Sequence, residues 1–127
     1  MLKQNKKIFL IGYKSFIQTN LYNHLKKNFL VNKIKFQDIY KKKISNCDVI
    51  INFSNSKKFY EKKYNKIYDR NLKIANIIKN SKTTFFLLSS RLVYSQKLNL
   101  SEKSKLSPIS IYGKNCLKSE KFCKYKL

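Results

Sequence analysis

The sequence has few of the residues from which metal centres and disulfide frameworks are built. His24 is the only histidine in 127 residues, and the cysteines are Cys47, Cys116 and Cys123. An odd number of cysteines without Cys-x-x-Cys spacing predicts neither a disulfide framework nor a zinc site. We therefore expect no metal centre in this chain.

Long apolar runs are also absent. No run approaches the roughly 20 residues that a membrane-spanning helix needs. The N-terminal stretch "MLKQNKKIFLIGYK" begins with basic residues, but its apolar core "IFLI" is shorter than the ~7–15 residues of a signal peptide. We expect no membrane span and a cytoplasmic location.

Acidic residues are scarce, and the balance of charge is strongly basic. Six acidic residues face 29 basic ones, which gives a net charge of +23. Such a charge attracts polyanions at low salt, so a non-catalytic basic module that binds nucleic acid or another acidic partner is a rival hypothesis. However, Arg70 and Arg91 are the only arginines, and the 27 lysines are spread along the chain. Sequence-reading proteins favour arginine on one face or tail. We therefore attribute the lysines to an AT-rich genome and do not expect nucleic acid to be the partner.

Short apolar runs are what the sequence does contain. Hydrophobic residues make up 43% of the chain, and the runs "KIFLIG", "DVIINF" and "TTFFLLSS" recur between polar stretches. Runs of this kind are typical of strands buried on both faces of a parallel sheet. The length allows one domain, residues 1–127, with its own core.

Helical patterns alternate with these runs. Residues 15–28 place Phe16, Leu21 and Leu25 towards one side, with Ser15 as an N-cap. Residues 59–79 carry one apolar and aromatic stripe, which we interpret as facing the core rather than RNA. The stripe is made of Tyr60, Tyr64, Ile67, Tyr68, Leu72, Ala75 and Ile78. We also expect a weaker strand at 33–36, a short helix at 39–46 and a closing helix at 112–124. Alternating strands and helices predict an α/β fold with a doubly wound parallel sheet, Rossmann-like.

Four stretches, read in order, carry a family resemblance. "IGYKSFIQTNL" runs from a strand into a helix through Gly12, with Ser15 and Gln18 where a dinucleotide-binding turn often has further glycines. "CDVIINFS", "DRNLKIANIIKN" with Asn71, and "FFLLSSRLVYS" followed by "SPISIYGKNCLKSE" complete the series. Together they resemble the extended short-chain dehydrogenases, specifically the NAD-dependent epimerase/dehydratase family that acts largely on nucleotide sugars.

The resemblance implies a set of site residues and a cofactor, NAD or NADP. Gly12 would open the phosphate loop. Ser90 would orient a substrate hydroxyl, and Tyr112 would be the catalytic acid/base. Asp38 follows Gly12 by 26 residues, rather than the usual ~20 for an acid that binds the adenosine ribose. We keep it as a cofactor-binding candidate with its role open. The other implied cofactor-binding residues are Ser15, Phe16, Ile17, Asn52, Phe53 and Ser54.

The catalytic set departs from the family pattern at one position. The family places a lysine four residues after the tyrosine, where it lowers the tyrosine pKa and holds the ribose. Here that residue is Cys116, and Lys114 lies about 200° round the helix from Tyr112. We interpret Cys116 as a buried small hydrophobe. We accordingly expect weak or absent turnover.

The chain is also short for this family, whose members continue with more strands and a region that binds the nucleotide sugar. We therefore expect an incomplete Rossmann-like sheet and a fragment of a larger active site. The expected substrate in full-length relatives is a nucleotide sugar. A scaffold that forms a homo-oligomer, or pairs with a full-length relative, stays open as a third alternative.

Overall fold

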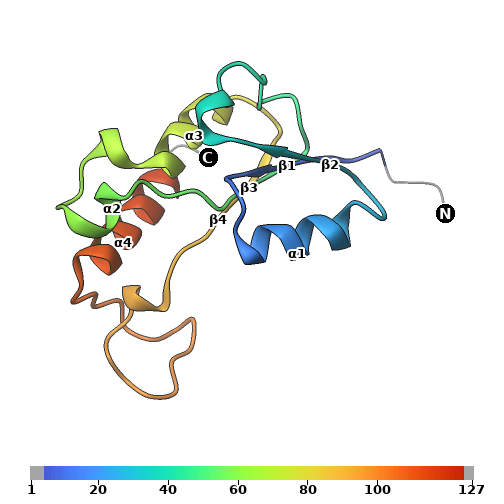
Figure 1. Ribbon diagram of the computed structural model, residues 1–127. Helices are drawn as coiled ribbons and strands as arrows, with labels where there is room; N and C mark the ends of the chain where they lie inside the picture. The colour runs from blue at the N-terminus through green and yellow to red at the C-terminus, as the bar shows by residue number, and fades with distance from the viewer. Residues whose placement is uncertain (1–4, 125–127) are drawn as a thin grey trace.

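A computed structural model describes residues 5–124 and centres on a parallel four-stranded sheet of order β2-β1-β3-β4 (Figure 1). The strands are β1 (Lys7–Ile11), β2 (Leu30–Ile34), β3 (Val49–Asn52) and β4 (Thr84–Leu87). The α/β, Rossmann-like class is thus confirmed. The weak strand predicted at 33–36 begins earlier and ends two residues sooner than expected.

The strands differ in burial because of their positions in the sheet. β1 pairs with β2 on one side and β3 on the other, and its Leu10 and Ile11 are fully buried. β4 pairs with β3 alone, and Phe86 is 54% exposed. The prediction that all three short apolar runs are buried on both faces is therefore wrong for this edge strand.

Helix α1 (Phe16–Leu25) covers one face of the sheet by itself, whereas α2 (Lys58–Glu61), α3 (Arg70–Ile78) and α4 (Ile111–Lys124) gather beside one end of the sheet (Figure 1). Its inner side carries Gln18, which is fully buried, and half-buried Leu21 and Leu25. These positions follow the i, i+3, i+7 spacing of one helical face. Phe16 lies two residues before Gln18, about 200° round the helix. It is 84% exposed, so the expectation that it faces the core is wrong.

The connection from β2 to β3 passes β1 without a regular α-helix. The predicted helix at 39–46 is wrong, because a short 3-10 helix η1 (Phe36–Asp38) is followed only by turns. Ile39 and Ile44 are fully buried and anchor this connection to the core. Lys43 takes the left-handed conformation at φ 45°, which an α-helix does not allow.

The stripe predicted over 59–79 is divided into three elements. They are α2 (Lys58–Glu61), the 3-10 helix η2 (Lys66–Tyr68) and α3 (Arg70–Ile78). Asn65 caps η2 and Asp69 caps α3, each through a side-chain oxygen that accepts a backbone N–H. Leu72, Ala75 and Ile78 are buried as expected, but Tyr60 and Ile67 are more than half exposed because the helix is interrupted between them, at residues 62–65.

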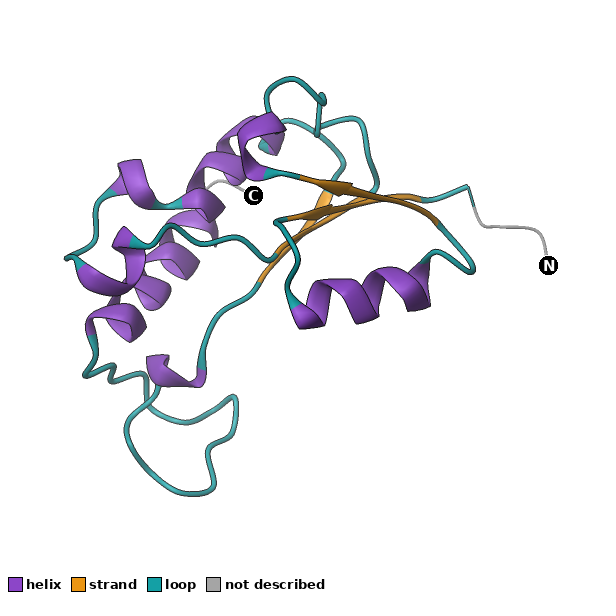
Figure 2. Cartoon of the chain, viewed as in Figure 1, coloured by secondary structure: helices purple, strands orange, loops and turns teal. Residues whose placement is uncertain are grey.

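The C-terminal part holds the 3-10 helix η3 (Arg91–Val93) and the helix α4 (Ile111–Lys124). Figure 2 shows the long irregular loop between them. This loop returns to η3 through an antiparallel bridge between Tyr94 and Leu106 and a bond from the Ser107 N–H to the Val93 carbonyl at 3.0 Å. None of the helices within residues 5–124 is long and apolar enough to cross a membrane.

Candidate functional site

The turn after β1 requires glycine for two reasons. Gly12 has φ +136°, a conformation that side chains with a Cβ rarely adopt. A Cβ at this position would lie 3.2 Å from the Cβ of Phe53, just after β3. The Gly12 N–H donates to the Ile34 carbonyl at 2.9 Å, so this turn touches the ends of both neighbouring strands. The sequence therefore places its glycine where β1, β2 and β3 end together.

The N-terminus of α1 faces out of this turn with open backbone donors. Ser15 Oγ accepts the Gln18 N–H at 3.0 Å and fixes the start of the helix. Among the described residues, the N–H groups of Phe16 and Ile17 have no acceptor. Both side chains extend into solvent, 84% and 61% exposed. An anion could therefore reach these N–H groups, and the helix dipole favours negative charge there.

Gln18 occupies the position where a third glycine often allows close packing of helix and strand. Its Nε2 donates to the carbonyls of Leu10 and Gly12 at 3.3 and 3.2 Å, and the residue is fully buried. Its Oε1 is buried and has no hydrogen-bond partner in the described part of the chain. A buried acceptor without a donor is costly. The Gln18 side chain thus holds the turn in place through two hydrogen bonds, and its Oε1 remains a buried acceptor without a donor.

A cavity of about 230 Å³ lies at the ends of β1 and β2 beside this turn. Three lysines line it, together with backbone and apolar groups: the lining is Gly12, Tyr13, Lys14, Gln18, Lys33, Ile34 and Lys35. The ammonium groups of Lys14 and Lys35 each lie 5.2 Å from the centre of the Tyr13 ring. Asp38, the acid expected at the ribose, is half-buried in η1 and does not line this cavity.

The end of β3 brings together the other predicted cofactor-binding residues. Asn52 Oδ1 accepts the Ser54 N–H at 3.0 Å and the Ser54 hydroxyl at 2.8 Å, which holds the small-residue turn in place. Asn52 Nδ2 donates to Asn71 Oδ1 at 2.6 Å, and Asn52, Ser54 and Asn71 are all buried. The amide groups of Asn52 and Asn71 therefore join the end of β3 to helix α3.

This polar chain continues into helix α4. Asn71 Nδ2 donates to Ser119 Oγ at 3.3 Å, and Ser119 donates to Asp69 Oδ1 at 3.0 Å. The fully buried Asp69 also accepts the Leu72 N–H at 3.0 Å and the Tyr64 hydroxyl at 2.6 Å. A buried carboxylate is stable only with such partners. The network ties β3, α3 and α4 into one rigid unit.

Ser90 and Tyr112 come from segments that pack against each other. Ser90 precedes η3, and its Oγ accepts the Leu92 N–H at 3.2 Å. Ser110 Oγ accepts the Gly113 N–H at 3.0 Å and so starts the helix that carries Tyr112. A Cβ at Gly113 would lie 2.3 Å from the Leu92 carbonyl oxygen. Glycine after Tyr112 is required because the backbones of η3 and α4 touch here.

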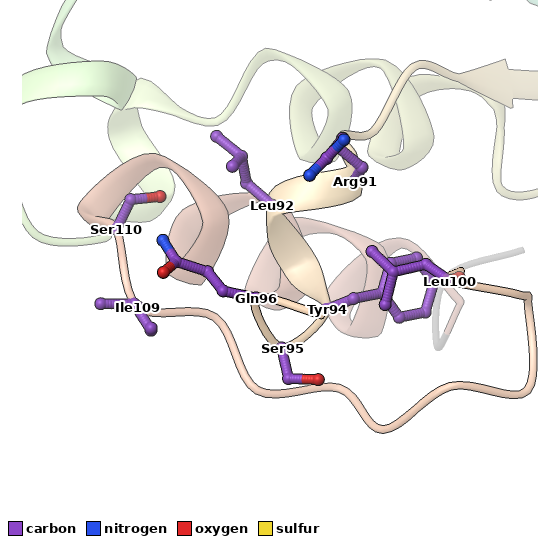
Figure 3. A pocket seen from close by; sticks show the side chains of 8 residues that line it. All are labelled: Arg91, Leu92, Tyr94, Ser95, Gln96, Leu100, Ile109 and Ser110. Atoms are coloured by element: carbon purple, nitrogen blue, oxygen red, sulfur yellow. The ribbon is translucent and has the colours of Figure 1, made fainter. Parts of the chain in front are cut away.

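The loop below η3 adds only a small hollow to this end of the molecule. Figure 3 shows the side chains of Arg91, Leu92 and Gln96 around it, with Ser110 at the start of α4. The cavity measures about 40 Å³, which is room for one or two waters rather than a sugar. The segment that joins Ser90 to Tyr112 therefore does not enclose a substrate pocket of its own.

Tyr112 itself is half-buried in an aromatic cluster. Its ring stacks on Tyr60 at 4.3 Å between centroids and meets Phe59 edge-on at 6.2 Å. Burial raises the pKa of the Tyr112 hydroxyl above its ordinary value, and neighbouring Cys116 and Tyr60 raise it further. Cys116 is 4% exposed, and burial likewise raises the pKa of its thiol. Tyr112 therefore stays protonated at neutral pH, and Cys116 is a packed hydrophobe.

The structure groups the predicted site residues into two sets. Gly12, Ser15, Phe16 and Ile17 lie with Phe53 and Ser54 at the ends of β1 and β3, whereas Ser90 and Tyr112 lie at the junction of η3 and α4.

Sequence reasoning missed the lysine-lined cavity, since the pairing of β2 with β1 brings Lys33 and Lys35 beside Gly12. It also missed the Asp69 to Ser119 bond, although Asp69 stands where an N-cap is expected. Within residues 5–124, His, Cys, Asp and Glu side chains form no group that could hold a metal ion.

Comparison with known proteins gives fold matches only. The chain matches no protein-family model and no curated protein by sequence. It is similar to the solved structure of a UDP-N-acetylglucosamine 4-epimerase from Methanobrevibacter ruminantium M1 in complex with UDP-N-acetylmuramic acid, with a TM-score of 0.77 and 18% identity over 98% of this chain. A UDP-glucuronic acid 4-epimerase from Bacillus cereus in complex with NAD matches with a TM-score of 0.73 and 20% identity over 94% of this chain.

A third solved structure, a dTDP-glucose 4,6-dehydratase from Bacillus anthracis in complex with NAD, matches with a TM-score of 0.72 and 15% identity over 95% of this chain. The chain spans about half the length of these structures, 51%, 52% and 50% respectively. The resemblance found in the sequence is therefore confirmed at the level of the fold: the chain has the Rossmann-like fold of about half of a nucleotide-sugar epimerase or dehydratase.

Proposed function

We propose that this chain is the NAD(P)-binding portion of a protein related to nucleotide-sugar epimerases, dehydratases and reductases. The observation that carries the proposal is the turn at Gly12, where a buried parallel strand passes into a capped helix beside the ends of β2 and β3. In open α/β sheets, ligands bind at the carboxyl ends of the strands where the strand order changes direction. In this chain β1 is that strand, with β2 on one side and β3 on the other.

The residues at this turn fit the adenosine and pyrophosphate half of a dinucleotide. The open N–H groups of Phe16 and Ile17 would bind the pyrophosphate, and no acidic side chain lines the neighbouring cavity. Gln18 Oε1 is a buried acceptor that a ligand hydroxyl or a water would satisfy. Asn52, Phe53 and Ser54, after β3, would line one wall of the dinucleotide site. Asp38 would lie at the edge of this site, outside the cavity lining.

The residues around Ser90 and Tyr112 fit the chemistry of these enzymes less well. A bound NAD(P) supplies hydride transfer to or from a sugar carbon. Ser90 would orient the substrate hydroxyl, and Tyr112 would exchange its proton. Because burial raises the Tyr112 pKa, its hydroxyl stays protonated near pH 7, so it is unavailable as a base and is only a weak acid. Cys116 supplies no positive charge to correct this. We therefore propose that the 127-residue chain has weak or no turnover by itself.

Dinucleotide binding is the direct test of this proposal. The purified chain should bind NAD or NADP in isothermal titration at ~150 mM salt, where purely non-specific polyanion binding collapses. The variant Ile17→Glu should lose most of this binding, because it sets a carboxylate beside the open N–H groups. Glutamate in the first turn also suits the helix dipole, so the fold should be retained.

Asn23→Glu is the matched control, since Asn23 is exposed on the same helix two turns further on. It makes the same change of charge and should bind like the parent chain. Absence of binding by the parent chain, or equal loss in both variants, contradicts the proposal. Binding of RNA that survives ~150 mM salt, without dinucleotide binding, supports the basic-module alternative instead.

A further inference from the structure

The cavity beside Gly12 has an unusual distribution of charge for a site that would bind the ribose of NAD. Lys14, Lys33 and Lys35 supply three ammonium groups around about 230 Å³, and no carboxylate lines it. Adenosine ribose sites for NAD commonly carry an acid that binds the 2′-hydroxyl, whereas those for NADP carry a basic residue for the 2′-phosphate. Asp38 is the nearest acid after β2, and it lies outside this lining.

The position of Lys35 follows from the register of the sheet. Ile11 pairs with Ile34, and the Gly12 N–H donates to the Ile34 carbonyl at 2.9 Å. Lys35 is the first residue after β2, so it leaves the sheet directly beside the Gly12 turn. Its ammonium group and that of Lys14 both lie 5.2 Å from the centre of the Tyr13 ring. The ammonium groups of two lysines, one after β1 and one after β2, therefore each lie near the same aromatic ring.

The third lysine closes the cavity on the side of α1. Lys33 lies in β2, and its ammonium group is 4.4 Å from the centre of the Tyr22 ring on α1. The only ion pair within residues 5–124 joins Lys57 and Glu61, so none of the three cavity lysines is neutralised by a carboxylate. Like charges around one cavity repel one another, and a bound anion relieves the repulsion.

We propose that this cavity holds a phosphate monoester on the adenosine ribose, so that the chain selects NADP over NAD. The inference rests on the proposed function, because the ribose reaches β2 only when the pyrophosphate lies at the N-terminus of α1. Lys35 and Lys14 make the charge-assisted bonds to the 2′-phosphate, and Lys33 contributes to the positive field. The lysines thereby set the specificity of a site whose fold relatives were solved with NAD.

Paired titrations of the 127-residue chain with NADP and NAD test this selection. We expect NADP to bind at least about tenfold more tightly, the effect of one charge-assisted hydrogen bond. Adenosine 2′,5′-bisphosphate should compete with NADP, whereas inorganic phosphate at equal concentration should not. Equal affinity for the two dinucleotides overturns the selection and leaves the proposed function intact. Binding of neither overturns both.

Variants separate the cavity from the general charge of the chain. Lys35→Glu should remove the preference by weakening NADP about tenfold or more while NAD changes little, and Lys35→Arg should keep it. The control Lys82→Glu makes the same charge change before β4, at the opposite end of the parallel strands. Lys35 and Lys82 are both exposed, so the variants should fold, which thermal unfolding checks. Equal weakening by Lys35→Glu and Lys82→Glu assigns the effect to net charge and overturns the inference.

Discussion

The two ends of the candidate site are built in opposite ways. At the Gly12 turn the polar groups are left open: two backbone N–H groups and a buried amide oxygen have no partner within residues 5–124, and a charged cavity lies beside them. Between α3 and α4 they are closed, because Asp69, Asn71 and Ser119 satisfy one another, and at the start of α4 the Tyr112 ring is stacked against Tyr60. Open polar groups are suited to a ligand, whereas a satisfied network is suited to rigidity. The difference indicates that the Gly12 end is suited to a ligand, whereas the Tyr112 end is suited to rigidity.

Removing the centre of the closed region should have the largest effect. Asp69→Ala leaves the Tyr64 hydroxyl, the Ser119 hydroxyl and the Leu72 N–H without their acceptor. Each unmet buried donor costs about 1–3 kcal/mol, so we expect the free energy of unfolding in urea to fall by about 4 kcal/mol. Asp69→Asn keeps one oxygen acceptor and should lose clearly less. A loss below about 1 kcal/mol in the alanine variant would mean that the network is not the source of rigidity.

Restoring the lysine of the family pattern should damage this region rather than activate it. Cys116 is buried against Phe59 and Val93, and Cys116→Lys inserts a longer, charged side chain there. Overpacking and burial of charge predict a loss of about 3 kcal/mol in unfolding free energy. Dinucleotide affinity per folded molecule should stay unchanged. Retained stability together with a new sugar-nucleotide activity would show that the region is less closed than described.

A smaller effect is expected where α4 touches η3. Gly113→Ala places a methyl group 2.3 Å from the Leu92 carbonyl oxygen, which must move. Overpacking costs about 1–3 kcal/mol, offset by the better helix propensity of alanine. We expect a net fall of about 1–2 kcal/mol in urea unfolding. The exposed position Lys114→Ala is the control on the same helix, and an equal effect in both would argue against the close contact.

The last expected effect is absent at neutral pH and appears only in alkaline solution. Burial raises the pKa of the Cys123 thiol from 9.0 to about 12. The folded state therefore favours the neutral thiol, and its contribution to stability is complete below pH 9 and is lost as pH rises towards 12. Under reducing conditions, the urea stability of the parent should fall more steeply between pH 9 and 11 than that of Cys123→Ala. Both chains carry the same lysines, so the difference between them removes the contribution of lysine titration. Identical slopes of stability against pH would contradict the burial of this thiol.

Local patterns were sufficient to predict the fold. The apolar runs identified β1, β3 and β4, and Ser15 marked the start of α1 through its cap. These features depend on residues close in sequence, where hydrophobic period and capping chemistry act directly. The helix that carries Tyr112 was predicted for the same reason, and Ser110 supplies its cap.

Features that depend on distant pairing could not be predicted. The lysine cavity exists because β2 pairs in register with β1, and Asp69 meets Ser119 across 50 residues of sequence. The broken helix at 62–65 also escaped prediction, since apolar spacing alone carries no information about the caps at Asn65 and Asp69. Phe16 was misplaced because the cap at Ser15 fixes which side of α1 meets the sheet, and that side carries Gln18.

Backbone amide shifts of the ¹⁵N-labelled chain during titration with NADP test the central contrast most directly. An open Gly12 end and a closed Tyr112 end predict shifts concentrated at residues 12–18, 33–35 and 53–54, with little change at residues 112–120. Shifts concentrated on the Tyr112 helix, or no shifts at saturating NADP, would contradict the account.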